Sequence, residues 1–146
     1  ANLIPQTRCL NGPPLFCSLG SIKPQKNTLE LIDLFSQIQT CHPSANLQII
    51  GPVQDTGYYT EVCRAITRYK LSDSVHFTGY LAPNLLGKAL QSTHIHLSTS
   101  RCETFGRAIF ETLACGIPNI ARTSYNAATD FLEQLPYIRF YNRYSE

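Results

Sequence analysis

Short apolar runs that alternate with longer stretches of helical period limit the folds open to this chain. Strand-like runs occupy residues 15–19, 47–51, 74–79, 94–98 and 118–121. Helical periods occupy residues 27–40, 56–69, 84–91 and 106–114, and a final helix at 127–135 and strand at 138–142 are also expected. This alternation is typical of a parallel sheet joined by crossover helices. We therefore predict an α/β fold, a Rossmann-like parallel sheet of about six strands with helices on both faces.

Length and composition favour one compact domain. The chain has 146 residues, of which 43% are hydrophobic, enough for a sizeable core. We assign residues 14–146 to the domain and residues 1–13 to a lead segment or interdomain linker. Because the first residue is Ala1 and methionine is absent, we expect the chain to be part of a longer protein.

Charge and cysteine usage exclude some classes of function. Twelve basic and ten acidic residues leave a net charge of +2 without a basic cluster, so nucleic acid is not an expected partner. No apolar stretch reaches the roughly 18 residues of a membrane span, and no signal peptide is evident, so we expect a cytoplasmic, soluble domain. The six cysteines form no Cys-x-x-Cys pair, which favours reduced, mostly buried thiols over a disulfide framework.

In an open parallel sheet, ligands bind beyond the carboxyl ends of the strands. The loops to inspect are therefore 20–27, 51–56, 79–83 and 99–107. Gly20, Ser21 and Lys26 supply a tight turn, a hydroxyl and an ammonium at the start of a helix, where peptide dipoles favour an anion. A solvated lysine near a helix start is the alternative interpretation.

The most informative motif begins at Glu103. Glu103 and Glu111 bracket a loop and the first turns of a helix, and Gly106 between them lets a ligand approach the backbone closely. Ionised carboxylates suit vicinal hydroxyls, so Glu111 fits a ribose and Glu103 a hexose. The competing interpretation makes Glu103 a capping residue and Glu111 a solvated helix residue.

Residues 103–118 resemble the E-x-F-G-x-x-x-x-E-x-x-A-x-G-x-P signature of the large retaining glycosyltransferase family 4, which has the two-domain GT-B fold. Further agreement comes in order along the chain from Gly20 with Lys26, Gly51, Val75-x-Phe77-x-Gly79 and Ser100. The resemblance covers about residues 16–121 and implies the C-terminal, donor-binding domain of such an enzyme.

The resemblance also implies roles for individual residues. Lys26 would neutralise the donor diphosphate, and Lys26 and Glu103 would be catalytic. Glu111 would bind the ribose, Glu103 the transferred sugar. The implied donor-binding set is Gly20, Ser21, Lys26, Gly79, Tyr80, Leu81, Ser100, Glu103, Thr104, Phe105, Gly106, Arg107 and Glu111.

The same resemblance implies a hexosyltransferase of EC 2.4 type that needs no metal or other cofactor. Its substrate would be a nucleotide sugar such as UDP-glucose, with UDP favoured. An N-terminal acceptor-binding domain of the same protein would be its partner, so the isolated chain is expected to be inactive. Peripheral association of the full-length protein with a membrane is a further expectation.

Two departures from the family pattern keep alternatives open. Ser21 stands where the family usually has an arginine beside the phosphates. This departure implies weaker donor binding, compensation by Lys23 or Arg107, or a non-catalytic nucleotide- or sugar-binding module. The glycine pair usual after the fifth strand is absent around Tyr125-Asn126. Half of an NAD-dependent dehydrogenase is disfavoured, because the glycine fingerprint and the acidic residue after the second strand are missing.

Other reactive side chains have structural interpretations that we prefer. His94 and His96 lie two apart on a predicted strand, as metal ligands can, but no third ligand is apparent nearby. Cys102 and Cys115 lack a motif that would place a base beside them, so inert thiols are favoured over nucleophiles.

Overall fold

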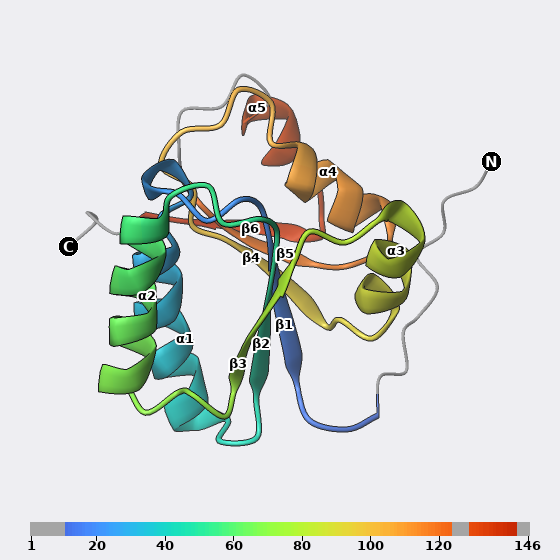
Figure 1. The fold of residues 1–146 in the computed structure, drawn as a ribbon. Helices are drawn as coiled ribbons and strands as arrows, with labels where there is room; N and C mark the ends of the chain where they lie inside the picture. Colours follow the sequence, from blue (N-terminus) through green and yellow to red (C-terminus); the bar gives the residue numbers. More distant parts are fainter. Residues whose placement is uncertain (1–10, 124–128, 143–146) are drawn as a thin grey trace.

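The computed structural model describes residues 11–123 and 129–142, which form a six-stranded sheet flanked by helices (Figure 1). The strands are β1 (Leu15–Leu19), β2 (Asn46–Ile50), β3 (Val75–Gly79), β4 (Ile95–Ser98), β5 (Asn119–Arg122) and β6 (Ile138–Tyr141). The helices are α1 (Thr28–Cys41), α2 (Thr56–Arg68), α3 (Pro83–Gln91), α4 (Arg107–Ala114) and α5 (Thr129–Leu132), with a 3₁₀ turn, η1, at Pro24–Lys26.

The strand order is β3-β2-β1-β4-β5-β6, and every neighbouring pair is parallel. From β1 the chain moves outward to β3, then returns to the other side of β1 and continues outward from β4 to β6. The order therefore reverses between β1 and β4, and such a switch point is where doubly wound folds bind ligands. The predicted α/β parallel sheet is confirmed.

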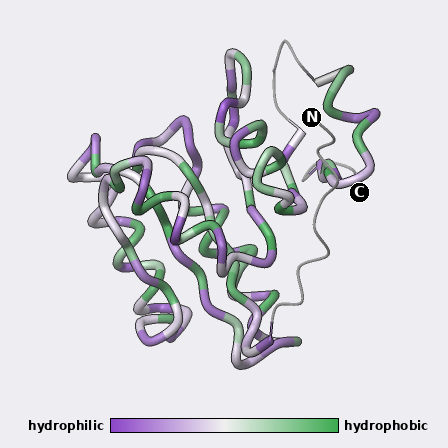
Figure 2. The backbone as a smooth tube through the Cα atoms, turned by 90° about the vertical axis from the view of Figure 1, so that its right-hand side faces the viewer, coloured by the Kyte–Doolittle hydropathy of each residue, from purple (hydrophilic) through white to green (hydrophobic). Residues whose placement is uncertain are grey.

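Helices cover both faces of the sheet. α1 and α2 lie on one face, where they bury the large core cluster that includes Phe16, Leu47 and Leu97. α3 packs on the opposite face over Cys17 and Ile50, and α4 and α5 pack there against β5 and β6. Figure 2 shows the helices changing between hydrophobic and hydrophilic residues within each turn, as expected for helices with one face on a sheet and the other toward solvent.

The structure refines the predicted element boundaries. Most predicted helices and strands agree with it within one or two residues at each end. The η1 turn was not predicted, and it is followed by Asn27, whose φ of 55° is left-handed. α5 is shorter than the predicted helix at 127–135, of which residues 127 and 128 lie outside the described residues. Most of the lead segment and the Tyr125-Asn126 pair also lie outside them.

The cysteine prediction was half right. The five described cysteines are free thiols, as expected, but Cys17 is the one that is buried, whereas Cys41, Cys102 and Cys115 are exposed. Cys41 ends α1 and Cys115 caps α4, so both stand where a helix reaches the surface. Among the described residues, no helix has the length and apolar character needed to cross a bilayer.

Candidate functional site

A cavity of about 440 Å³ opens at the carboxyl edge of the sheet, beside the switch point between β1 and β4. The segments that line it follow β1, β2, β3 and β4, so the parallel topology brings them to one edge. Its lining residues are Leu19, Gly20, Ser21, Lys26, Ile50, Gly51, Tyr80, Leu81, Leu86, Glu103, Thr104, Phe105, Gly106, Arg107, Ala108 and Glu111.

All predicted donor-binding residues except Gly79 and Ser100 line this cavity. Gly79 lies just behind it, where its carbonyl accepts a 3.0 Å hydrogen bond from the Gly51 amide. Ser100 lines a smaller cavity of about 20 Å³ that also touches Lys26 and Glu103. Outside the predicted donor-binding set, the cavity is also lined by Leu19, Ile50, Gly51, Leu86 and Ala108. Of these, only Gly51 carried a signal in the sequence, as a glycine at a strand end in one of the loops singled out.

Gly51 explains how the loops after β1 and β2 come so close together. A Cβ atom on this residue would lie 2.1 Å from the Gly20 carbonyl oxygen, and its φ of 151° lies in the region that favours glycine. Any side chain there would collide with the main chain of the turn that leads to Lys26. The contact therefore requires glycine.

Lys26 and Glu103 meet inside the cavity. The Lys26 ammonium donates to a Glu103 carboxylate oxygen at 2.5 Å, and their side chains are 25% and 17% exposed. Lys26 is the last residue of η1, and Glu103 lies in the loop between β4 and α4. The residue expected to bind the diphosphate, Lys26, and the residue expected to bind the transferred sugar, Glu103, are thus in direct contact.

The start of α4 also lines the cavity. Gly106 caps the helix with a left-handed φ of 77°, and the first helical residues, Arg107 and Ala108, line the cavity. The first amides of an α-helix have no acceptor within the helix, so this end offers donors and a positive dipole to an anion. Glu111 lies one turn further on, and Arg107 approaches it at 3.9 Å in a largely exposed pair of little energetic weight.

His96 in β4 and His94, the residue just before that strand, both accept hydrogen bonds from the main chain of β1. The Leu15 amide donates to Nδ1 of His94 at 3.0 Å, and the Leu19 amide donates to Nε2 of His96 at 3.2 Å. Nδ1 of His96 must then carry the proton that it shares with the Asn119 side-chain oxygen, 2.5 Å away. Complete burial lowers the pKa of His96 to about 4, so its ring is neutral at physiological pH.

These contacts give the two histidines structural roles, the interpretation that the sequence favoured. In the described ranges, three His, Cys, Asp or Glu side chains do not gather anywhere closely enough to hold a metal ion. The groups that line the cavity are one ammonium, the largely exposed Arg107 guanidinium, helix-start amides, hydroxyls and two carboxylates. This donor and acceptor set suits a ligand with phosphate and hydroxyl groups.

Comparison with known proteins identifies the family. A family model described as glycosyl transferases group 1 matches residues 2–134. This chain belongs to the group 1 glycosyl transferases. Among curated members it is 28% identical over 111 residues to an alpha-monoglucosyldiacylglycerol synthase of Streptococcus pneumoniae, covering 76% of the chain. It is 29% identical over 108 residues to a mannosylfructose-phosphate synthase of Agrobacterium fabrum, covering 70% of the chain.

Solved structures of other glycosyltransferases share the fold. Anabaena HepE, crystallised with UDP and glucose, superposes with a TM-score of 0.77 at 26% identity over 89% of the chain. The C-terminal domain of a group 1 family protein from Francisella tularensis gives a TM-score of 0.67 at 19% identity, over 84% of this chain and 76% of that domain.

The length of the matches also matters. This group 1 glycosyl transferase chain spans 24% of the length of each of the two curated relatives and 34% of HepE. It therefore corresponds to a part of those proteins.

Proposed function

We propose that this chain is the donor-binding domain of a retaining glycosyltransferase of family 4 and holds a nucleotide diphosphate sugar, with UDP as the nucleotide. One observation supports this above the others: a single cavity at the switch point combines Lys26, the open start of α4, and the carboxylates of Glu103 and Glu111. Each group matches one part of such a donor.

The diphosphate lies between Lys26 and the start of α4. Lys26, Gly106 and Arg107 all line the cavity, and the last two stand at the start of α4. As the bond between the sugar and the diphosphate breaks, the bonding electron pair goes to the phosphate oxygen. A fixed ammonium and aligned amides stabilise the charge that develops there, so no metal ion is required in this role.

The ribose and the transferred sugar bind through the two carboxylates. Glu111 accepts hydrogen bonds from the ribose hydroxyls and Glu103 from the hydroxyls of the sugar. The base lies at the other end, where Tyr80, Leu81 and Leu86 provide an apolar wall. Tyr80 is 73% exposed, so its ring is free to lie along a flat base.

UDP is the favoured nucleotide because HepE was crystallised with UDP and glucose, and HepE is similar to 89% of this chain. The acceptor and its hydroxyl come from outside this chain, and an N-terminal domain of the same protein is the proposed source of the acceptor site. Transfer keeps the anomeric configuration, and the leaving phosphate takes the proton of the acceptor hydroxyl.

Calorimetry with UDP, GDP and ADP tests the donor assignment. The chain should bind UDP, and Glu111→Ala should weaken that binding by about 1–3 kcal/mol, the cost of losing charge-assisted hydrogen bonds. Glu61→Ala is the matched control, because Glu61 is an exposed glutamate on α2 that does not line the cavity. Equal UDP affinity of Glu111→Ala and the control would refute the ribose assignment.

Ser21 supports one alternative, a binding module that kept the fold and lost turnover. It lines the cavity at the position where the family usually places an arginine. Arg107 is the other cation on the cavity wall, but its side chain is 86% exposed and paired with Glu111. Incubation of the full-length protein with a labelled UDP-sugar separates the two readings, because a binding module yields no transferred label.

A further inference from the structure

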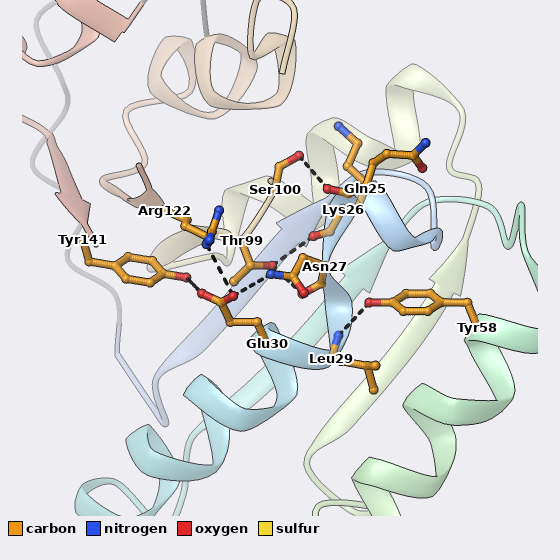
Figure 3. A network of polar contacts seen from close by, with 10 residues as sticks. All are labelled: Gln25, Lys26, Asn27, Leu29, Glu30, Tyr58, Thr99, Ser100, Arg122 and Tyr141. Carbon is orange, nitrogen blue, oxygen red and sulfur yellow. Dashed lines mark hydrogen bonds and ion pairs between the residues drawn. The ribbon is translucent and has the colours of Figure 1, made fainter. Parts of the chain in front are cut away.

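The turn that carries Lys26 is fastened to the loop that carries Glu103. The carbonyls of three consecutive residues, Gln25, Lys26 and Asn27, all accept hydrogen bonds from residues 99–101 (Figure 3). The Arg101 amide and the Ser100 hydroxyl donate to the Gln25 carbonyl at 2.9 Å and 3.2 Å. The Thr99 hydroxyl lies within bonding distance of the next two carbonyls.

Thr99 is the central residue of this contact. Its Oγ1 lies 3.1 Å from the Lys26 carbonyl oxygen and 3.0 Å from the Asn27 carbonyl oxygen, so one hydroxyl is shared between them. The side chain is 2% exposed. It does not line the large cavity, but together with Ser100 it lines the smaller one that also touches Lys26 and Glu103. Thr99 directly follows β4, whose pairing with β1 and β5 fixes its position.

The second side of the turn is held independently. The Asn27 side chain donates to Glu30 at 2.5 Å, and Glu30 also contacts Arg122 and Tyr141 (Figure 3). These contacts around Glu30 hold the side chain of Asn27, one residue beyond Lys26. Thr99 acts on the main chain of Lys26 itself, and this makes it the residue whose loss most directly frees the lysine.

We propose that Thr99 is a positioning residue for Lys26, fixing the peptide of this lysine so that its ammonium enters the cavity next to Glu103. The proposal rests on the proposed donor-binding function, since it assigns Thr99 to the diphosphate contact without any contact of its own with the donor. An ammonium on a long flexible stem loses side-chain entropy when it is held in one place. A fixed main chain reduces the number of directions that the stem can take.

Three variants test the proposal. Thr99→Val keeps the shape of the side chain and removes the hydroxyl, and Thr99→Ser keeps the hydroxyl. Thr93→Val is the matched control, because Thr93 is buried before the other end of β4 and its hydroxyl donates to the Ala89 carbonyl at 3.0 Å. UDP affinity should fall about 3- to 10-fold in Thr99→Val, the range for one net hydrogen bond, and stay near the original value in Thr99→Ser and Thr93→Val.

The decisive comparison repeats Thr99→Val in a Lys26→Ala background. If Thr99 acts through Lys26, its substitution has no further effect on UDP affinity once the lysine is gone. The same fold-loss in both backgrounds would overturn the proposal, because Thr99 would then act on the general structure of the site. Unchanged affinity of Thr99→Val in the original background would also overturn it.

A measurement without nucleotide separates this proposal from the donor assignment. The ammonium of Lys26, paired with Glu103, should give a ¹⁵N NMR signal that is protected from exchange with water and is assigned by its loss in Lys26→Arg. Thr99→Val should abolish this protection and Thr99→Ser should retain it. If no UDP binds but the signal behaves in this way, the donor assignment fails and the positioning role stands. Full protection in Thr99→Val would overturn the positioning role, whatever binds.

Discussion

Helices α1 and α4 begin in the same way and end up with different tasks. Each follows a residue in the left-handed conformation, Asn27 with a φ of 55° and Gly106 with a φ of 77°, and each starts at the carboxyl edge of the sheet. At α1 the protein fills this terminus itself. The Leu29 amide donates to the Tyr58 hydroxyl at 3.0 Å, and Asn27 is buried and bonded to Glu30.

At α4 the corresponding groups face the cavity. Gly106 has no side chain to cover the helix start, and the next two residues line the cavity wall. The comparison shows that neighbouring side chains decide whether a helix start is satisfied within the protein or left open to the cavity. An open helix start favours negative charge. The start of α1 serves as an anchor for Lys26, and the start of α4 is left open for the proposed donor.

The largest effect should come from breaking the anchor. Glu30 receives the Asn27 amide, the Tyr141 hydroxyl at 2.9 Å and Arg122 at 3.4 Å, and it is 9% exposed. Glu30→Ala removes the carboxylate from this buried cluster and should lower the free energy of unfolding by about 3 kcal/mol, as measured by urea denaturation. Glu61→Ala, on the exposed face of α2, should change it by less than about 0.5 kcal/mol. Equal stabilities of the two variants would contradict the anchor role.

α4 is held by a chain of neutral groups instead. Thr112 on α4 and Asn119 on β5 exchange a hydrogen bond at 3.0 Å, and Asn119 meets His96, which accepts from the Leu19 amide just before Gly20. This chain connects the helix to the end of β1 behind the cavity. His96 is the titratable side chain in this set of hydrogen bonds.

The second largest effect should therefore be a pH dependence of stability. The pKa of His96 is lowered by burial to about 4 in the folded protein, whereas an unfolded histidine titrates near 6.5. Between these values the unfolded chain binds the proton and the folded chain does not, so stability falls as the pH is lowered. From pH 7 to pH 5 the loss should be roughly 2 kcal/mol, measured by urea denaturation at each pH.

Substitution identifies the residue responsible. His96→Asn should lose most of this pH dependence in the same window, although it is less stable throughout. His76→Gln, at an exposed position of β3, should retain the slope of the original protein. A slope that persists unchanged in His96→Asn would assign the pH dependence to another group.

Much of the fold and of the cavity could be predicted from sequence because both depend on local patterns. The alternation of runs predicted the parallel sheet, and the resemblance carried by the ordered glycines and acids implied most of the lining. Thr99 and Glu30 were not predicted, because they act through contacts with residues far away in the sequence. Thr99 bonds to Asn27, at a separation of 72 residues, and Glu30 to Tyr141, at a separation of 111 residues. The η1 turn was missed since three residues around a proline carry no periodicity, and Leu86 lines the cavity only through the packing of α3.

The smallest effects sharpen the comparison between the two helix starts. Gly106→Ala forces a side chain into the left-handed conformation and should lower the free energy of unfolding by about 1 kcal/mol. Because Gly106 lines the cavity, the change in its backbone conformation should lower UDP affinity as well.

Asn27→Gly should change almost nothing by comparison. Glycine relieves the left-handed conformation at Asn27 while the hydrogen bond to Glu30 is lost, and the two contributions offset each other to within about 0.5 kcal/mol. UDP affinity should also stay constant, because Thr99 still holds the carbonyls of Lys26 and of residue 27. Urea denaturation of Gly106→Ala and Asn27→Gly measures the two free energies of unfolding, and calorimetry measures the UDP affinity of each variant. A loss of UDP affinity in Asn27→Gly as large as that in Gly106→Ala would mean that the start of α1, like that of α4, contacts the ligand.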